Sequence, residues 1–423
     1  MRSYDVVVVG AGLIGGSIAL RLAQEHLRVA LFDRQEPARE ASWAAAGMLS
    51  PAPDSLADVP LIPFSRASLA LYPDFVTEVE DLSGQRVHYR SEGTIEALFS
   101  GDAERKLSTL IALHHGLGLP TEPLPLDEAR KLEPALGREV RAAALLPFEG
   151  SVDNRALTEA VLAAGVAEGV ELCAHANVVR LASDAERCTG VIVREGAAAQ
   201  RPGTKRPDTH RPGTVRRDAV RRDAGPPDTG HHHTLRSGTE ETIAAGHVVL
   251  AAGAFSAKIA GVSPPATTRP IRGQMVALRC AGIQLRRVLR SERGYLVPRD
   301  DNTTQRVVAG STLEDADFEK RVTPAGLERI LSAAQELVPA LSDAEIVETW
   351  CGLRPDTPDH LPILGPAELR HLTVATGHYR NGILLAPITA KLVREWITES
   401  RVSMDWEIFS PLRFSSGQTF DKS

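Results

Sequence analysis

The sequence has few or none of the features that mark several common classes of protein. It contains only four cysteines in 423 residues. Their spacing forms neither a C-x-x-C pair nor a zinc motif, so we expect no disulfide scaffold and no bound metal. No run of about 18 apolar residues occurs, which argues against a membrane-spanning helix. Lys and Arg number 48 against 54 Asp and Glu, which argues against nucleic-acid binding. We expect a cytoplasmic protein.

Residues 200–233 have too few apolar side chains to fold. They include eight Lys or Arg, four Asp, five Pro and four Gly, in approximate repeats of the R-P-G-T and R-R-D-A type. Such a composition cannot bury enough apolar surface to offset the entropy of ordering. We therefore predict a disordered, low-complexity insertion between two strands. The alternative interpretations are an arginine-rich arm for anionic partners, or metal binding by the histidines at 231–233.

The rest of the chain alternates between strand and helix patterns, which is typical of an α/β architecture. With 43% hydrophobic residues, it is long enough for two or three domains with real cores. Strand patterns occur at 29–33, 171–182, 188–194, 242–250 and 373–376. Helical patterns occur at 13–24, 65–82, 154–168, 326–338 and 382–398.

The N-terminal segment carries the signal of a dinucleotide site. Four valines predict a buried parallel strand, and G-A-G-L-I-G follows them directly at residues 10–15. Gly10 and Gly12 permit a tight turn and a close approach to a pyrophosphate, and Gly15 lets the next helix pack on the strand. The N–H groups that begin this helix would face the phosphate. A second strand ends at Asp33, where a ribose-binding carboxylate is expected, and this acid argues against NADP.

Three further segments favour FAD over NAD. The loop A-S-W-A-A-A-G-M-L at 41–49 is rich in small residues, which would let a flat ring system lie against the backbone. A tightly packed core crossing is the alternative interpretation of this loop. A strand in the middle of the chain ends in small residues at Gly253. The segment G-H-Y-R-N-G at 377–382 leads into a long helix, whose N-terminus could stabilise negative charge on a reduced flavin.

Six motifs, in this order, carry a family resemblance that spans nearly the whole chain except residues 200–233. They are G-A-G-L-I-G (10–15), A-A-A-G-M-L (44–49), G-Y-L-V-P-R (294–299), W-C-G-L-R-P (350–355), P-I-L-G (362–365) and G-H-Y-R-N-G-I-L-L-A-P (377–387). In these motifs the chain resembles the glycine oxidases of thiamine biosynthesis. Those enzymes belong to the D-amino-acid oxidase family of FAD-dependent oxidoreductases.

The resemblance implies a fold and a set of cofactor contacts. The fold is a Rossmann-like FAD-binding domain, glutathione-reductase-like and of the D-amino-acid oxidase type, with a second, β-rich α+β substrate domain. The FAD domain would comprise 1–85, 147–266 and 348–423, and the substrate domain 86–146 and 267–347. Besides the three glycines and Asp33, the residues expected to bind FAD are Leu13, Ile14, Arg34, Ser42, Ala46, Gly47, Met48, Val178, Gly253, His378, Tyr379, Arg380, Asn381, Gly382, Ile383 and Leu384. We expect non-covalent FAD, because the residues after Cys351 match glycine oxidases.

An amino-acid oxidase needs position and charge from the protein, because the flavin supplies the redox chemistry. A planar guanidinium binds the substrate carboxylate through two hydrogen bonds, which lysine cannot do. By resemblance, Arg354 is the carboxylate-binding arginine, the Tyr295 hydroxyl reaches the same carboxylate, and Arg380 lies near the substrate. Thr312 and Arg293 replace a methionine and a histidine of a better-known type of glycine oxidase, which leaves the preferred substrate size open.

The activity implied by the resemblance is oxidative deamination of glycine, or of small amines such as sarcosine and D-alanine. The product is an imine or glyoxylate, and O2 is reduced to hydrogen peroxide. This product would feed thiazole synthesis, which suggests a functional link to a thiazole synthase, and a homo-oligomer is expected. The alternative enzyme is a D-amino-acid dehydrogenase that passes electrons to a quinone. The alternative from another class is a non-catalytic flavin-binding subunit.

Overall fold

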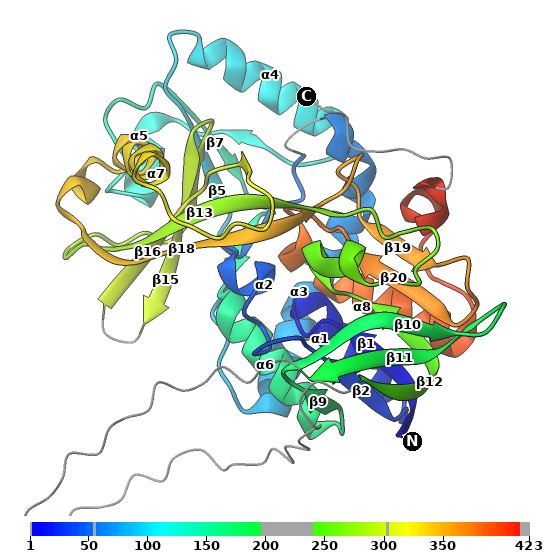
Figure 1. The fold of residues 1–423 in the computed structure, drawn as a ribbon. Coiled ribbons are helices and arrows are strands. Elements are labelled where there is room, and N and C mark those ends of the chain that lie inside the picture. Colours follow the sequence, from blue (N-terminus) through cyan, green and yellow to red (C-terminus); the bar gives the residue numbers. More distant parts are fainter. Residues whose placement is uncertain (1, 54–55, 196–239, 302–303, 415–423) are drawn as a thin grey trace, which may run out of the picture.

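The chain forms two large β-sheets with helices packed against them (Figure 1). The computed structural model describes residues 2–53, 56–195, 240–301 and 304–414. The insertion predicted at 200–233 lies outside the described residues.

The first sheet has parallel strands at its centre. Within the described residues its strands are β1 (Ser3–Val9), β2 (Val29–Phe32), β9 (Glu171–Cys173), β10 (Ala176–Ser183), β11 (Cys188–Glu195), β12 (Glu240–Leu250), β19 (Ile363–Pro366) and β20 (Leu372–Thr376). β1 lies between β2 and β12, and both pairings are parallel. β12 also pairs in parallel with β20, while β10, β11 and β12 form an antiparallel ribbon. The parallel strands therefore end at a common edge.

Helices cover both sheets. They are α1 (Leu13–Gln24), α2 (Ala41–Ala44), α3 (Ile62–Ser83), α4 (Ala103–Gly116), α5 (Leu126–Leu132), α6 (Asn154–Ala167), α7 (Pro324–Leu337) and α8 (Gly382–Glu399). The five helices predicted from the sequence are confirmed as α1, α3, α6, α7 and α8, within three residues at each end. The strand pattern at 171–182 is two strands, β9 and β10, because the chain turns at His175, whose φ is 56°.

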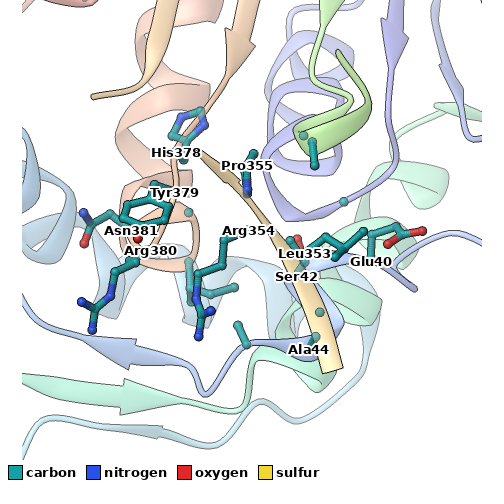
Figure 2. Close-up of a pocket in the computed structure, with 18 of the residues that line it drawn as sticks. Glu40, Ser42, Ala44, Leu353, Arg354, Pro355, His378, Tyr379, Arg380 and Asn381 are labelled. Carbon is teal, nitrogen blue, oxygen red and sulfur yellow. The ribbon is translucent and has the colours of Figure 1, made fainter. Parts of the chain in front are cut away.

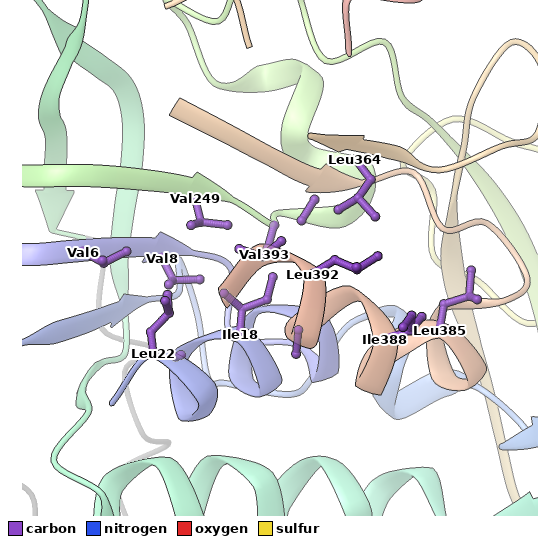
Figure 3. Packing of buried hydrophobic residues seen from close by; sticks show 14 of the residues in the cluster. Val6, Val8, Ile18, Leu22, Val249, Leu364, Leu385, Ile388, Leu392 and Val393 are labelled. Carbon is purple, nitrogen blue, oxygen red and sulfur yellow. The ribbon is translucent and has the colours of Figure 1, made fainter. Parts of the chain in front are cut away.

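The valines of β1 are buried on both faces of the first sheet, which explains their continuous apolar run. Successive side chains of a strand point to opposite faces. Val6 and Val8 therefore pack against α1 and α8 (Figure 3). Val7 and Val9 pack on the other face, with side chains of β10, β11 and β12. Burial on both faces is typical of parallel strands.

The second sheet is largely antiparallel and has its own core. In the part of the chain that the structure describes, its strands are β5 (Thr94–Leu98), β6 (Glu122–Pro123), β7 (Ala142–Leu146), β13 (Arg269–Arg279), β14 (Val288–Ser291), β15 (Gly294–Asp301), β16 (Thr304–Gly310), β17 (Glu314–Asp315) and β18 (Glu345–Asp356). β13 and β18 are paired along their whole length. Side chains of α5 and α7 pack into the core of this sheet, and both helices lie beside it in Figure 1.

The two sheets take their strands from alternating parts of the chain. The first uses segments within 3–32, 171–250 and 363–376, and the second uses segments within 94–146 and 269–356. A small third sheet joins β3 (Met48–Leu49) and β4 (Tyr89–Arg90) to β8 (Gly150–Val152). The predicted boundary at residue 348 falls inside β18, and the domain boundaries stay a prediction.

The helices formed by the described residues are all too short or too polar to cross a membrane.

A buried carboxylate fixes the start of β14 against α5. Glu133 follows α5 directly and is fully buried. It accepts hydrogen bonds from the backbone N–H groups of Arg286, at 3.1 Å, and of Arg287, at 2.8 Å. Burial raises the pKa of Glu133, whereas these N–H groups lower it. The contact joins two parts of the second sheet that lie about 150 residues apart in sequence.

We predict that Glu133→Ala lowers the free energy of unfolding by about 2 kcal/mol, because two backbone donors lose their acceptor. Urea unfolding followed by circular dichroism measures this. Glu128→Ala, which removes an exposed carboxylate of α5, is the matched control and should change stability by less than about 0.5 kcal/mol. Equal effects of the two substitutions would contradict the structural role of Glu133.

Candidate active site

A cavity of about 1070 Å³ lies at the carboxyl edge of the first sheet. The residues that directly follow four parallel strands line it: Gly10 after β1, Asp33 after β2, Ala251 after β12 and Gly377 after β20. Ligands of open α/β sheets bind at this edge. Residues of the second sheet line another side of the cavity, among them Tyr295 of β15.

The turn between β1 and α1 requires glycine. Gly10 has a φ of 107°, and a Cβ at this position would lie 2.4 Å from the carbonyl oxygen of Ala251. Gly12 and Ile14 line the cavity where α1 begins. The N–H of Leu13 donates to Ser42 Oγ at 2.9 Å, so this hydroxyl lies directly at the helix N-terminus. Helix N-termini bind phosphate through such N–H groups and the helix dipole.

The carboxylate of Asp33 is held by backbone N–H groups at the same edge. Its Oδ2 accepts from Ala11 at 2.9 Å, and its Oδ1 accepts from Gln35 at 3.1 Å. Burial raises the pKa of Asp33, whereas the two N–H groups lower it. The carboxylate is therefore oriented beside the phosphate turn, where a ribose hydroxyl would be bound.

A loop of small residues forms one wall, and the segment before α8 forms another. Ala44, Ala45 and Ala46 line the cavity together with Gly47 and Met48. The N-terminus of α8, at Gly382, also borders it. In Figure 2 the labelled residues 378–381 lie on one side of Arg354, and Ser42 and Ala44 on the other. A flat ring system fits between such small side chains and the backbone.

His378 is buried and neutral. Its Nε2 lies 3.1 Å from Thr389 Oγ1 of α8. Burial lowers the pKa of His378 to about 3, so this imidazole carries no charge at neutral pH. Its role in the cavity wall is packing and hydrogen bonding.

Arg354 extends from β18 across a glycine of the neighbouring strand. Its Nη2 donates to Ser311 Oγ at 2.7 Å, and its Nη1 donates to the carbonyl oxygen of Thr312 at 3.2 Å. A Cβ on Gly273 of β13 would lie 2.1 Å from Nη1. The guanidinium therefore lies directly on the backbone of β13, and any larger residue there would displace it.

Two further groups act on Arg354 from different elements. The hydroxyl of Tyr295 lies 3.6 Å from the sulfur of Met275. The same hydroxyl raises the pKa of the Arg354 guanidinium. Burial, the largest effect, lowers this pKa, and the positive charge of Arg380 lowers it further. The backbone N–H of Tyr379, next to Arg380, donates to the carbonyl oxygen of Pro355 at 3.0 Å. This bond joins the segment before α8 to β18.

Most residues proposed from the sequence line this one cavity. They are Gly10, Gly12, Ile14, Asp33, Arg34, Ser42, Ala46, Gly47, Met48, Val178, Gly253, Tyr295, Arg354, His378, Tyr379, Arg380, Asn381, Gly382 and Ile383. Leu13, Gly15 and Leu384 lie outside its lining. Leu13 and Leu384 are core residues of the same cluster, and Gly15 lets α1 pack on the backbone of Gly10.

Thr312 and Arg293, the two residues that differ from the better-known type of glycine oxidase, have different surroundings. Thr312 is buried, lies outside the cavity lining, and its Oγ1 accepts from the backbone N–H of Gln274 at 2.9 Å. Arg293 borders the cavity, but its guanidinium is held by Glu336 of α7 at 3.1 Å. Cys351 also lies outside the lining, which agrees with non-covalent FAD.

Sequence reasoning missed the partners of Arg354 and an ion pair in the cavity lining. Ser311 and Gly273 were not singled out, although a glycine inside a strand is a signal of close backbone approach. Two other lining residues, Arg290 and Glu96, form an ion pair, and Arg290 also pairs with Glu149, which is buried outside the lining. No local motif marks these three residues, because their elements meet only in the folded sheet.

Comparison with known proteins agrees with this geometry. The family model described as "FAD dependent oxidoreductase" (DAO) matches residues 5–396. The glycine oxidase of Geobacillus kaustophilus is 31% identical over 414 residues, which cover 97% of each chain. Its crystal structure superposes with a TM-score of 0.79 over 97% of this chain and 98% of that one. The L-proline dehydrogenase of P. horikoshii, at 20% identity and a TM-score of 0.77, shares the fold.

A bifunctional protein ThiO/ThiG from Trichormus variabilis is 32% identical over 402 residues. These residues cover 94% of this chain but 53% of that protein, so the chain spans about half of its length. The chain belongs to the DAO family of FAD-dependent oxidoreductases, and its fold is the mixed α/β fold of that family.

We predict that His378 stays neutral at mildly acidic pH. An unfolded histidine takes up a proton near pH 6.5, but the folded protein does so here only near pH 3. The free energy of unfolding therefore falls as the pH drops through this window, by up to about 1.4 kcal/mol per unit. Histidine NMR titration measures the imidazole, with His378→Gln to assign its signal. A midpoint near 6.5 would contradict the burial described.

Proposed function

We propose that this protein is an FAD-dependent oxidase that deaminates glycine and also accepts small amines such as sarcosine and D-alanine at the same site. The amine of glycine is oxidised to an imine while O2 is reduced to hydrogen peroxide, and water then converts the imine to glyoxylate and ammonia. The observation that carries the proposal is the guanidinium of Arg354 on the wall of a cavity that otherwise fits FAD. Relatives that are named glycine oxidases support the choice of substrate.

The residues present fit FAD. The turn at Gly10 leaves no room for a Cβ, so backbone can approach a pyrophosphate, and the α1 N-terminus lies beside it. Asp33 would hold the ribose, and the loop at 44–48 would border the ring system. When bound, FAD supplies two-electron redox chemistry. The protein supplies orientation and charge.

Arg354 would bind the substrate carboxylate. Ser311 Oγ and the carbonyl oxygen of Thr312 fix the plane of its guanidinium. Arg380 lies close enough to Arg354 for its positive charge to lower the pKa of Arg354, so two cations together would attract an anion here. The hydroxyl of Tyr295 would donate a hydrogen bond to the same carboxylate. With the carboxylate held, the amine and the α-carbon of a small substrate have a fixed position, which is how orientation lowers a barrier.

The proposal also covers a partner enzyme, the oligomeric state and the location of the protein. The likeness to the ThiO half of a ThiO/ThiG protein supports a link to thiazole synthase, through supply of the imine or glyoxylate. A homo-oligomer and a cytoplasmic location are part of the same proposal, and the free state of all four cysteines supports a reducing compartment.

One experiment tests the function and its alternatives. Glycine is added to the purified, FAD-loaded protein without oxygen, and the flavin absorbance is followed; air is then admitted and peroxide is assayed. We expect bleaching by glycine and peroxide in air. Bleaching with little peroxide would favour the quinone-linked dehydrogenase. Absence of bleaching with glycine, sarcosine and D-alanine would overturn the oxidase proposal and favour a non-catalytic subunit.

We predict that Arg354→Ala raises the KM for glycine strongly while FAD stays bound. Loss of one partner of a buried charge pair costs about 2 kcal/mol or more, which is roughly 30-fold in KM. Steady-state peroxide assays measure the KM, and the flavin spectrum reports bound FAD.

Gly273→Ala is the companion variant, because its Cβ would displace the guanidinium without removing it. Its KM should rise in the same direction. Arg279→Gln, at the other end of β13, removes an arginine that pairs with Glu345 outside the cavity, and should leave the KM unchanged. An unchanged KM in Arg354→Ala would remove Arg354 from the substrate site.

A further inference from the structure

A second arginine, Arg299, lies behind the loop of small residues that lines the cavity. It belongs to β15, four positions after Tyr295, but it lies outside the cavity lining. The loop at 44–48 separates it from the space in which FAD fits. Arg299 therefore touches neither cofactor nor substrate, and any effect it has must pass through this loop.

The guanidinium of Arg299 binds the loop directly. Its Nη2 donates to the carbonyl oxygen of Ala46 and, at 2.9 Å, to Asn154 Oδ1. A Cβ on Gly47 would lie 3.0 Å from the same Nη2. The amide of Asn154 in turn donates to the carbonyl oxygen of Ser42 at 2.7 Å. The loop is thus held from behind at Ala46, and Asn154 also holds Ser42 in α2, just before the loop.

The contact with Ala46 also sets the direction of a backbone donor. In a trans peptide the C=O and the following N–H point in opposite directions. Because the carbonyl of Ala46 points back at Arg299, the N–H of Gly47 points toward the cavity. Among the described residues this N–H takes part in no hydrogen bond. A buried donor without a protein partner is available to a ligand or a water molecule.

The positive charge of Arg299 has little compensation nearby. No described carboxylate forms an ion pair with it, and Asp153 is the nearby acid that raises its pKa. Arg155 and Arg306, which lower its pKa, share the carboxylate of Glu348. Burial is the largest effect and lowers the pKa of Arg299 to about 10. The side chain is still protonated at neutral pH.

We propose that Arg299 is a positioning residue that fixes the flavin-facing loop and directs the Gly47 N–H at the bound FAD, and that its charge raises the reduction potential of the flavin. Reduction adds negative charge to the flavin. A fixed cation and an oriented N–H dipole stabilise that charge, and the effect is large where water is excluded. The proposal needs bound FAD and does not depend on glycine as the substrate.

The test is the midpoint potential of the FAD-loaded protein, measured by equilibration with a reference dye and a chemical reductant. Arg299→Gln should shift the potential to more negative values. It should also raise the FAD dissociation constant about tenfold, because a charge-assisted contact to the loop is lost. Arg299→Lys retains the charge and should recover most of the potential. Arg279→Gln, on the same sheet, should behave like the wild type.

Each outcome decides the proposal. If Arg299→Gln has the wild-type potential and only binds FAD more weakly, Arg299 is a packing residue and the proposal is overturned. If Arg299→Gln does not fold, Asn154→Asp replaces it, because a carboxylate beside Nη2 would neutralise the charge. That variant should shift the potential in the negative direction, and an unchanged value would overturn the proposal. Because no amino acid is added, the result is separable from failure of the glycine oxidase proposal.

Discussion

The candidate site depends on the parallel pairing of β1 with β2 and β12. This pairing brings three separate segments of the chain to one edge, so that the turn at Gly10, the carboxylate of Asp33 and the small residues after β12 face a common space. The pairing is stable because β1 is buried on both faces, under α1 and α8 on one side and the β10–β12 ribbon on the other. The turn at Gly10 therefore directly extends a core strand, and the burial of that strand fixes its position.

The second sheet contributes two positively charged arginine side chains, and each guanidinium lies close to the protein backbone. Arg354 crosses β13 at a glycine, and Arg299 lies against the loop that borders the cavity. In both cases a guanidinium is oriented by carbonyl or hydroxyl oxygens, so part of its hydrogen-bonding capacity is used while its charge stays. A charge held in this way is ready before a ligand arrives, which is the arrangement that electrostatic stabilisation requires.

Much of this site could be predicted from the sequence, because its parts are local. The glycine turn, the strand that ends at Asp33 and the motifs around Arg354 and His378 are contiguous, and their order indicates one cavity. The parts that could not be predicted are contacts between segments that lie far apart in the sequence. Ser311 and Gly273 reach Arg354 only through strand pairing, and Glu149 reaches Arg290 across 141 residues. Leu13 and Leu384 were expected to contact FAD because they lie within binding motifs, but both belong to the hydrophobic core and lie outside the cavity lining.

β18 ties the two sheets together. It is paired with β13 along its whole length, and it packs on α2, where the indole N–H of Trp350 donates to the carbonyl oxygen of Ala44 at 3.0 Å. At its other end, Pro355 accepts a hydrogen bond from the segment before α8. A hinge between the sheets would have to break these contacts and carry Arg354 away from the cavity. Because the strand that carries Arg354 is held at both ends, any motion of one sheet relative to the other would also move this guanidinium.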